Sequence, residues 1–155
     1  MSERADWVDD LDVQPGDHII AIITDEDDVK LLARYITAGL QKGEHCSVLA
    51  SPHKVEPLKA GVCEHGIDAD QAIADESMLF VDPRALGTGD DGEFDMDRFI
   101  DGVSAFIDQC EERGIKHVRN CGAMSWLNDV ASPDDALYLE ARLADVFEGR
   151  PMSGF

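Results

Sequence analysis

Four carboxylates follow the first apolar segment of the chain, at the position where many nucleotide-binding α/β proteins carry a phosphate loop. His18–Ile23 reads as a buried strand, and the run Thr24-Asp25-Glu26-Asp27-Asp28 comes directly after it. A phosphate loop needs glycines and a lysine at this point, whereas these carboxylates repel phosphate from the start of the following helix. They also lack the central glycine and terminal glutamate of a calcium-binding EF-hand loop. We therefore expect neither a phosphate site nor a metal site in this turn.

Polar and sulfur-bearing side chains also follow the other predicted strands. Ligands of open α/β sheets bind beyond the carboxyl ends of the strands. The candidates at these ends are Thr24, Asp25, Ser51, Asp82, Cys121, Met124 and Trp126. Met124 and Trp126 would suit a small apolar ligand, although both would also pack well beneath the last helix. Asp82 follows Met78–Val81 as a magnesium-binding aspartate does in NTPases, but without a phosphate loop it is better explained as a turn residue.

Two titratable residues fall inside predicted strands. Arg119 lies within Lys116–Cys121, where an unpaired charge would be costly. We expect it to form an ion pair with Asp82 or Glu140, and binding of an anionic ligand group is the alternative. His18 begins the first strand, away from the carboxyl ends. A structural histidine bonded to a loop explains it better than a ligand contact or a proton switch does.

The cysteines and serines show none of the arrangements that support catalysis or metal binding. The cysteines are Cys46, Cys63, Cys110 and Cys121. They are widely spaced and match no zinc template, so we expect buried free thiols. No serine lies in a G-x-S-x-G nucleophile elbow. We therefore expect no enzymatic activity, no bound metal and no cofactor.

The composition is strongly acidic. The 155 residues carry a formal net charge of −20, from 33 acidic residues against 13 basic ones. The acids are spread along the whole sequence, which is typical of proteins from very salty cells such as haloarchaea, where salt screens self-repulsion. Because no basic face is available for phosphates, we expect no direct contact with nucleic acid. The N-terminus lacks an apolar leader and no apolar run approaches the ~20 residues of a membrane span, so we expect a soluble, cytoplasmic protein without a membrane partner.

Apolar runs alternate with amphipathic segments along the chain. Residues 1–15 are acidic and lack periodicity, which predicts a flexible N-terminal arm, and residues 16–155 predict a single domain. Strands are expected at 18–23, 45–50, 78–81, 116–121 and 152–155. One helix is expected at 27–41, and three further helices are expected to begin at about residues 52, 95 and 133. Ser51 and Ser132, each followed by proline, are expected to cap helices. The apolar side of the last helix consists of Leu137, Leu139, Leu143, Val146 and Phe147. This alternation predicts a three-layer, mainly parallel α/β fold.

Several short motifs occur in the order and spacing of a known family. They are Gly16-Asp17-His18-Ile19, Ala38-Gly39-Leu40-Gln41-Lys42-Gly43-Glu44, Gly92-Glu93-Phe94-Asp95, Arg119 through Gly122-Ala123-Met124-Ser125-Trp126, and Glu140-Ala141-Arg142-Leu143. With this set the chain resembles the MEDS domain, a sensory domain named for methanogens, methylotrophs and the regulator DcmR, over about residues 15–155. The Gly-Leu-x-x-Gly-Glu element is also similar to RecA/KaiC-like ATPases. The residues that carry the resemblance are Asp17, His18, Gly39, Leu40, Gly43, Glu44 and Glu140.

The resemblance implies a RecA/KaiC-like domain without a phosphate loop that senses a small organic molecule, with hydrocarbon derivatives as the family's proposed ligands. It also implies signalling or transcriptional regulation through a partner such as a kinase or regulator. A degenerate nucleotide-binding or ATPase-like protein is one alternative, and an oligomerising scaffold is another. Two features depart from the family pattern: Ala123 replaces a glutamate before Trp126, and the sequence ends at Phe155, before the family's Cys-x-Tyr-Asp element.

Overall fold

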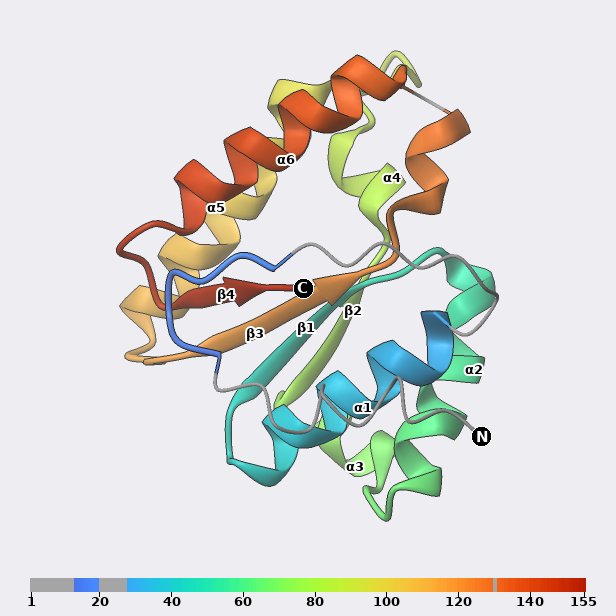
Figure 1. Cartoon of the computed structure of the whole chain (residues 1–155), viewed down its shortest axis with the longest axis vertical. Coiled ribbons are helices and arrows are strands. Elements are labelled where there is room, and N and C mark those ends of the chain that lie inside the picture. Colours follow the sequence, from blue (N-terminus) through green and yellow to red (C-terminus); the bar gives the residue numbers. More distant parts are fainter. Residues whose placement is uncertain (1–12, 20–27, 130) are drawn as a thin grey trace.

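The centre of the molecule is a parallel β-sheet in the computed structural model, which describes residues 13–19, 28–129 and 131–155. The four strands in these residues are β1 (His45–Leu49), β2 (Met78–Val81), β3 (Val118–Gly122) and β4 (Met152–Gly154). Their spatial order is β2-β1-β3-β4 (Figure 1). Every pairing between them is parallel, so their carboxyl ends meet along one edge of the sheet.

Helices cover both faces of the sheet. One face carries α1 (Asp28–Gln41), α2 (Pro52–Glu64) and α3 (Ala69–Ala74) (Figure 1). The other carries α4 (Pro83–Gly87), α5 (Met96–Glu112), the short 3-10 helix η2 (Met124–Asp129) and α6 (Pro133–Phe147). The predicted three-layer α/β fold is thus confirmed. The sequence did not predict α3, α4 or η2, because each is at most 6 residues long and shows no repeating apolar pattern.

Two hydrophobic cores separate the three layers. The core between the sheet and α1 to α3 includes Leu32, Tyr35, Ile36, Val48, Leu58, Val62 and Met78. The core between the sheet and α5 and α6 includes Phe99, Ile100, Ile107, Val118, Leu139, Leu143 and Phe147. Because helices cover the sheet on both faces, even polar strand residues such as Ser47, Arg119 and Ser153 are buried. In the part of the chain that the structure describes, no helix is long and apolar enough to cross a bilayer.

The predicted helices begin close to the expected residues, but not every expected cap residue makes a capping hydrogen bond. Ser132 forms a capping box with Asp135 and so begins α6 as expected. Ser51 stands at the N-cap of α2, yet its side chain makes no capping hydrogen bond. Leu137, which we expected on the buried side of α6, is 71% exposed, because it points away from the side on which Leu139 and Leu143 meet the core.

The segment of residues 13–19 lies beside β4. The Ile19 amide donates to the Gly154 carbonyl and the Gly154 amide donates to the Asp17 carbonyl, both at 2.8 Å. These bonds extend the parallel pairing, as expected for the start of a strand at residue 18. Val13 is buried in the first core, so this end of the predicted arm packs against the domain. Residues 1–12 and 20–27, and with them the candidates Thr24 and Asp25, lie outside the described residues.

Candidate functional site

The carboxyl ends of three strands surround one cavity. Ser51 follows β1, Arg84 lies shortly after β2, and Ser125, Trp126 and Asp129 lie on η2 after β3. With Pro52 and His53 at the start of α2, these residues line a cavity of about 250 Å³. The parallel topology explains the arrangement, since it brings the loops after β1, β2 and β3 to the same edge.

Polar and apolar groups share the lining of the cavity. Arg84 Nη1 lies 3.8 Å from Asp129 Oδ2 across it, and both side chains are half exposed or more. Ser51 and Ser125 contribute hydroxyl groups, and His53 an imidazole. The N-terminus of α2 also lies here, and it carries the partial positive charge of the helix dipole. A ligand with a hydrogen-bond acceptor or a negative charge therefore suits this site better than a pure hydrocarbon does.

Trp126 both packs in the core and lines the cavity. Its ring lies 5.5 Å from that of Phe94 and 5.6 Å from that of Phe99, and the side chain is only 4% exposed. The indole N–H is buried without a hydrogen-bond partner among the described residues. Trp126 thus packs in the core, and its contact with a ligand stays a prediction. The side chain of Met124 lies outside what the structure describes.

Two other candidates at this edge do not line the cavity. Asp82 caps α4, where its carboxylate accepts a hydrogen bond from the Arg84 amide at 3.0 Å, so it is the turn residue that the sequence suggested. Cys121 is buried in the first core, and burial raises the pKa of its thiol well above the usual range. The structure therefore brings together Ser51 and Trp126 but separates them from Cys121.

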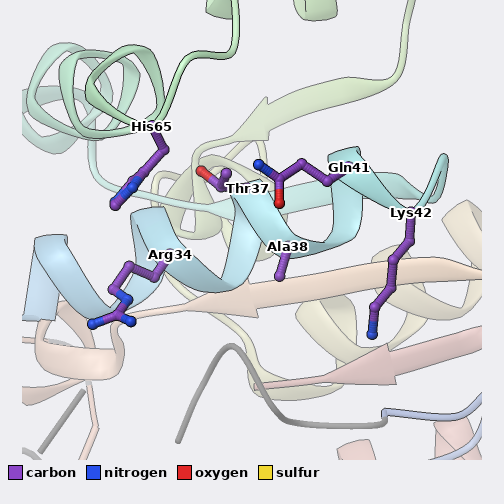
Figure 2. A pocket seen from close by; sticks show the side chains of 6 residues that line it. All are labelled: Arg34, Thr37, Ala38, Gln41, Lys42 and His65. Atoms are coloured by element: carbon purple, nitrogen blue, oxygen red, sulfur yellow. The ribbon is translucent and has the colours of Figure 1, made fainter. Parts of the chain in front are cut away.

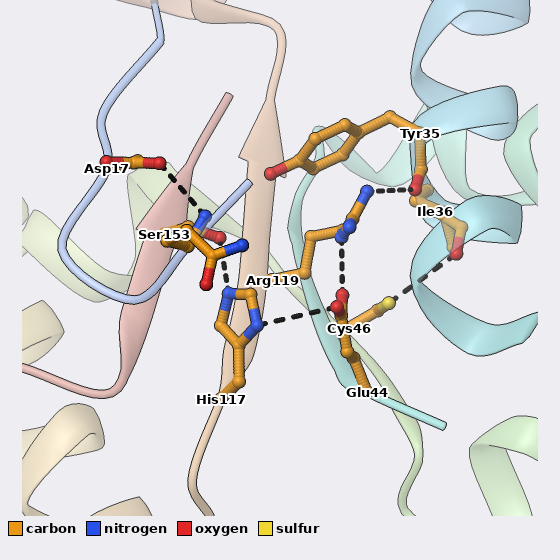
Figure 3. A network of polar contacts seen from close by, with 9 residues as sticks. Asp17, Tyr35, Ile36, Glu44, Cys46, His117, Arg119 and Ser153 are labelled. Carbon is orange, nitrogen blue, oxygen red and sulfur yellow. Dashed lines mark hydrogen bonds and ion pairs between the residues drawn. The ribbon is translucent and has the colours of Figure 1, made fainter. Parts of the chain in front are cut away.

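Arg119 pairs with neither of the partners that we expected. Its side chain is fully buried, and its Nε donates to Glu44 Oε2 at 2.7 Å (Figure 3). Its guanidinium lies 4.5 Å from the centre of the Tyr35 ring, and Nη1 donates to the Tyr35 carbonyl at 3.4 Å. Asp82 lies beyond the carboxyl end of β2, whereas Glu44 immediately precedes β1, next to β3. Through these contacts Arg119 ties β3 to α1.

The Gly-Leu-x-x-Gly-Glu element is built around this arginine. A Cβ at Gly39 would lie 2.7 Å from Arg119 Cδ and 2.9 Å from Cys46 Sγ, so only glycine leaves room for the buried side chain. Gly43 has φ of +77° and ends α1 in the left-handed conformation, after which Glu44 reaches Arg119. Leu40 packs against the first core. The motif that resembles ATPases thus serves packing and ion pairing here.

A second pair of motif residues joins α6 to the segment beside β4. His18 Nε2 lies 3.1 Å from Glu140 Oε2, and the His18 ring meets that of Phe147 edge-on at 5.4 Å. We expected a structural histidine bonded to a loop, whereas the partner that the structure shows is a carboxylate of α6. This contact spans two elements far apart in sequence, which no local pattern could reveal.

His117 is a polar residue that the sequence analysis missed. Its Nε2 lies 2.8 Å from Ser153 Oγ, and its Nδ1 lies 3.5 Å from Glu44 Oε1 (Figure 3). Burial lowers the pKa of His117 below its usual range, and Glu44 opposes this effect. No local sequence pattern predicts the contacts of a polar residue that stands directly before a strand. Only the register of β3 with β4 brings it to Ser153.

The lowered pKa of His117 predicts a loss of stability in mild acid. A histidine whose pKa is lower in the folded state binds protons better when unfolded, so the free energy of unfolding should decrease as the pH falls below about 6.5. His117→Gln should reduce this decrease, because glutamine does not titrate. The measurement is urea unfolding at several pH values between about 5 and 8. His53→Gln, at an exposed position, is the control; equal pH dependence in all three proteins would contradict the assignment.

The described residues offer no metal site. No cluster of three or more histidine, cysteine, aspartate or glutamate residues among them could hold an ion. Cys46, Cys110 and Cys121 are buried free thiols as expected, and burial raises the pKa of Cys46 to about 12. Cys63 is exposed, contrary to our expectation, since it lies on the solvent side of α2.

A second cavity lies away from the carboxyl edge. It is lined by Arg34, Thr37, Ala38 and Gln41 of α1, by Lys42 directly after that helix and by His65 (Figure 2). Its volume is about 350 Å³. Its basic side chains would suit an anion. It lies, however, where α1 and α2 both end, and the partial negative charge of helix C-termini opposes an anion there. We therefore regard the cavity at Ser51 and Trp126 as the better candidate.

Comparison with known proteins places the chain in a family. The family model described as MEDS, the MEthanogen/methylotroph, DcmR Sensory domain, matches residues 17–155. No curated protein matches the chain. The matched range covers nearly the whole sequence, including the His18–Glu140 pair and the Gly39–Glu44 element whose contacts are described above. The chain is therefore a member of the MEDS family of sensory domains.

Proposed function

We propose that this sensory domain binds a small organic molecule in the cavity at the carboxyl ends of β1, β2 and β3 and signals its presence to a partner protein without catalysing a reaction. The observation that carries the proposal is the convergence of Ser51, Arg84 and Trp126, from the separate segments that follow β1, β2 and β3, on one cavity of about 250 Å³. Convergent polar groups beside an aromatic ring are typical of small-ligand sites.

The size and chemistry of the cavity limit the ligand. A cavity of ~150 Å³ is enough for benzene, whereas drug-sized ligands fill pockets of ~300–1,000 Å³. A ligand somewhat larger than benzene fits this site. Arg84 and the N-terminus of α2 favour a carboxylate or another acceptor, and a flat or apolar part can lie against Trp126. An acceptor that reaches the buried indole N–H of Trp126 would also satisfy that donor.

A degenerate nucleotide-binding protein is less well supported. The turn where a phosphate loop would stand is acidic in sequence, and its last residue, Asp28, forms an ion pair with Lys54. The basic residues Arg34 and Lys42 lie at the other cavity, toward the end of α1. A nucleoside triphosphate is also larger than a ligand for which a cavity of 250 Å³ provides room.

An oligomerising scaffold has one observation in its favour. Within the described sheet β2 is an edge strand, and its Leu79 is 43% exposed. Unpaired edge strands can join a second chain. Sedimentation of the chain over a range of concentrations tests this alternative, since a scaffold must associate without any small molecule.

A thermal-shift screen in high-salt buffer tests ligand binding. The compounds are aromatic and aliphatic carboxylates, halogenated hydrocarbons and ATP with Mg²⁺. We expect stabilisation by small carboxylates, because a ligand that binds only the folded state adds to its stability. Stabilisation by ATP and Mg²⁺ alone would contradict the proposal, and no stabilisation by any compound would favour the scaffold.

Two variants locate the binding site. Arg84→Gln should weaken carboxylate binding by about tenfold, because a charge-assisted hydrogen bond is lost. Ser125→Tyr should abolish binding by filling the cavity. Arg113→Gln is the matched control, since Arg113 is an exposed arginine paired with Glu76 outside the cavity. Titration calorimetry measures the affinity of all three variants for the carboxylate. Equal affinity in Arg84→Gln and Arg113→Gln would exclude this cavity as the binding site.

A further inference from the structure

An apolar groove runs along the start of α6. It has a volume of about 420 Å³ and is lined mainly by Leu127, Ala131, Pro133, Ala136, Leu137 and Glu140. Leu127 is buried, whereas Leu137 is 71% exposed and the neighbouring Tyr138 is 48% exposed. Among the described residues, Leu137 is the most exposed of the large hydrophobic side chains. An exposed leucine beside an apolar groove marks an interaction surface better than a single surface leucine would.

We propose that this groove binds an amphipathic helix of a partner protein that carries lysine or arginine beside its apolar stripe. The groove is formed by residues of η2 and α6 together with Ala131 and Ser132 before α6, and not by a sheet edge, so it offers no row of strand backbone groups to an extended strand. A helix that inserts apolar side chains is the mode of binding that fits such a surface.

The charge around the groove determines the character of the partner. Glu140 lines it, and the exposed Asp134 and Asp135 stand in the first turn of α6, while no lysine or arginine lines it. The chain as a whole carries a net charge of −20. These charges favour a basic partner and oppose both a second copy of the same chain and an anionic membrane.

The groove also lies next to the candidate ligand cavity. Ser125, Trp126 and Asp129 of η2 line the cavity, and Leu127 of the same short helix lines the groove. A ligand that shifts η2 would therefore shift a wall of the groove. This coupling rests on the proposed function, but binding of the helix at the groove does not require a ligand.

A labelled peptide tests the proposal on the full chain. The probe is a leucine–lysine amphipathic helix of about 18 residues, or about five turns. One matched peptide has serine in place of leucine, and another has glutamate in place of lysine. Fluorescence anisotropy is measured at about 0.15 M and about 1 M salt, because non-specific charge attraction is lost at the higher concentration. We expect only the leucine–lysine peptide to bind at both salt concentrations.

Two leucine variants assign the binding surface. Leu137→Ser should weaken peptide binding at least about tenfold, as expected for an apolar contact at the centre of an interface. Leu79→Ser, which changes another exposed leucine on the distant strand β2, should leave affinity within about twofold. Because Leu137 is exposed, its replacement does not threaten the fold.

Three results would overturn the proposal. The first is that Leu137→Ser binds the peptide as tightly as the original protein does. The second is that the serine–lysine peptide binds as tightly as the leucine–lysine peptide. The third is a dimer in sedimentation that Leu137→Ser abolishes, which would assign the groove to a second copy. The small-molecule screen is an independent measurement. A ligand response without peptide binding would reject only the groove proposal, and peptide binding without a ligand response would reject only the proposed function.

Discussion

Glu44→Ala is expected to lower the free energy of unfolding by about 3–5 kcal/mol, because it leaves a buried charge without its partner. Arg119 is fully buried, and Glu44 supplies its 2.7 Å carboxylate contact. The remaining contacts, the Tyr35 ring and carbonyl, carry no full negative charge. Since Glu44 itself is 15% exposed, water can partly replace it, which places the expected loss toward the lower end of the range. Urea unfolding followed by circular dichroism measures the change.

An exposed pair of the same chemistry is the control. Glu76 lies 2.7 Å from Arg113, the same distance as between Glu44 and Arg119. The side chains of Glu76 and Arg113 are, however, both more than half exposed. Glu76→Ala should therefore cost no more than about 1 kcal/mol. The double variant Glu44→Gln with Arg119→Met should recover most of the lost stability, since it removes both charges. Equal losses in Glu44→Ala and Glu76→Ala would show that the buried pair contributes no more than a surface pair.

Gly39→Ala is expected to destabilise the protein by about 1–3 kcal/mol, although alanine normally stabilises a helix relative to glycine by up to about 1 kcal/mol. The new Cβ would lie 2.7 Å from Arg119 Cδ and 2.9 Å from its Nε. Arg119 cannot easily move away, because Glu44 and Tyr35 hold its guanidinium. The replacement should therefore strain the whole contact between α1 and β3. Urea unfolding again gives the measurement.

Gly102→Ala in α5 separates this clash from helix propensity. A Cβ there would meet the terminal methyl of Leu86 at 2.6 Å, and a leucine end can rotate away. We expect Gly102→Ala to change the free energy of unfolding by no more than about 1 kcal/mol in either direction. If Gly39→Ala were as stable as the original protein, Arg119 would be free to move and its close packing against α1 would be unimportant for stability.

The candidate site was only partly predictable from the sequence. Ser51 and Trp126 were found because carboxyl ends of parallel strands share an edge, which follows from the α/β pattern alone. Arg84 and Asp129 were missed, because they lie in short elements without apolar periodicity, and His53 was missed although its helix α2 was expected, because no local pattern shows that a helix residue lines a cavity. Arg119 was assigned to the wrong partner: an ion pair across 75 residues depends on the register of the sheet and not on any local spacing.

Leu137 shows the same limit on a helix. Its apolar type suggested burial, but the direction of its side chain depends on how α6 is rotated against the sheet. That rotation is set by the packing of Leu139, Leu143 and Phe147 in the second core. The sequence pattern could not distinguish a core leucine from a surface one in this turn.

By itself the sequence determined the order of the described strands and of the longer helices, the three-layer α/β class and the family, because hydrophobic periodicity, helix caps and short motifs are local properties. The tertiary structure alone decided which residues share a cavity, that Glu44 neutralises Arg119 and that Leu137 faces solvent. These depend on the register and rotation of elements distant in the chain, which are set by the joint packing of all layers.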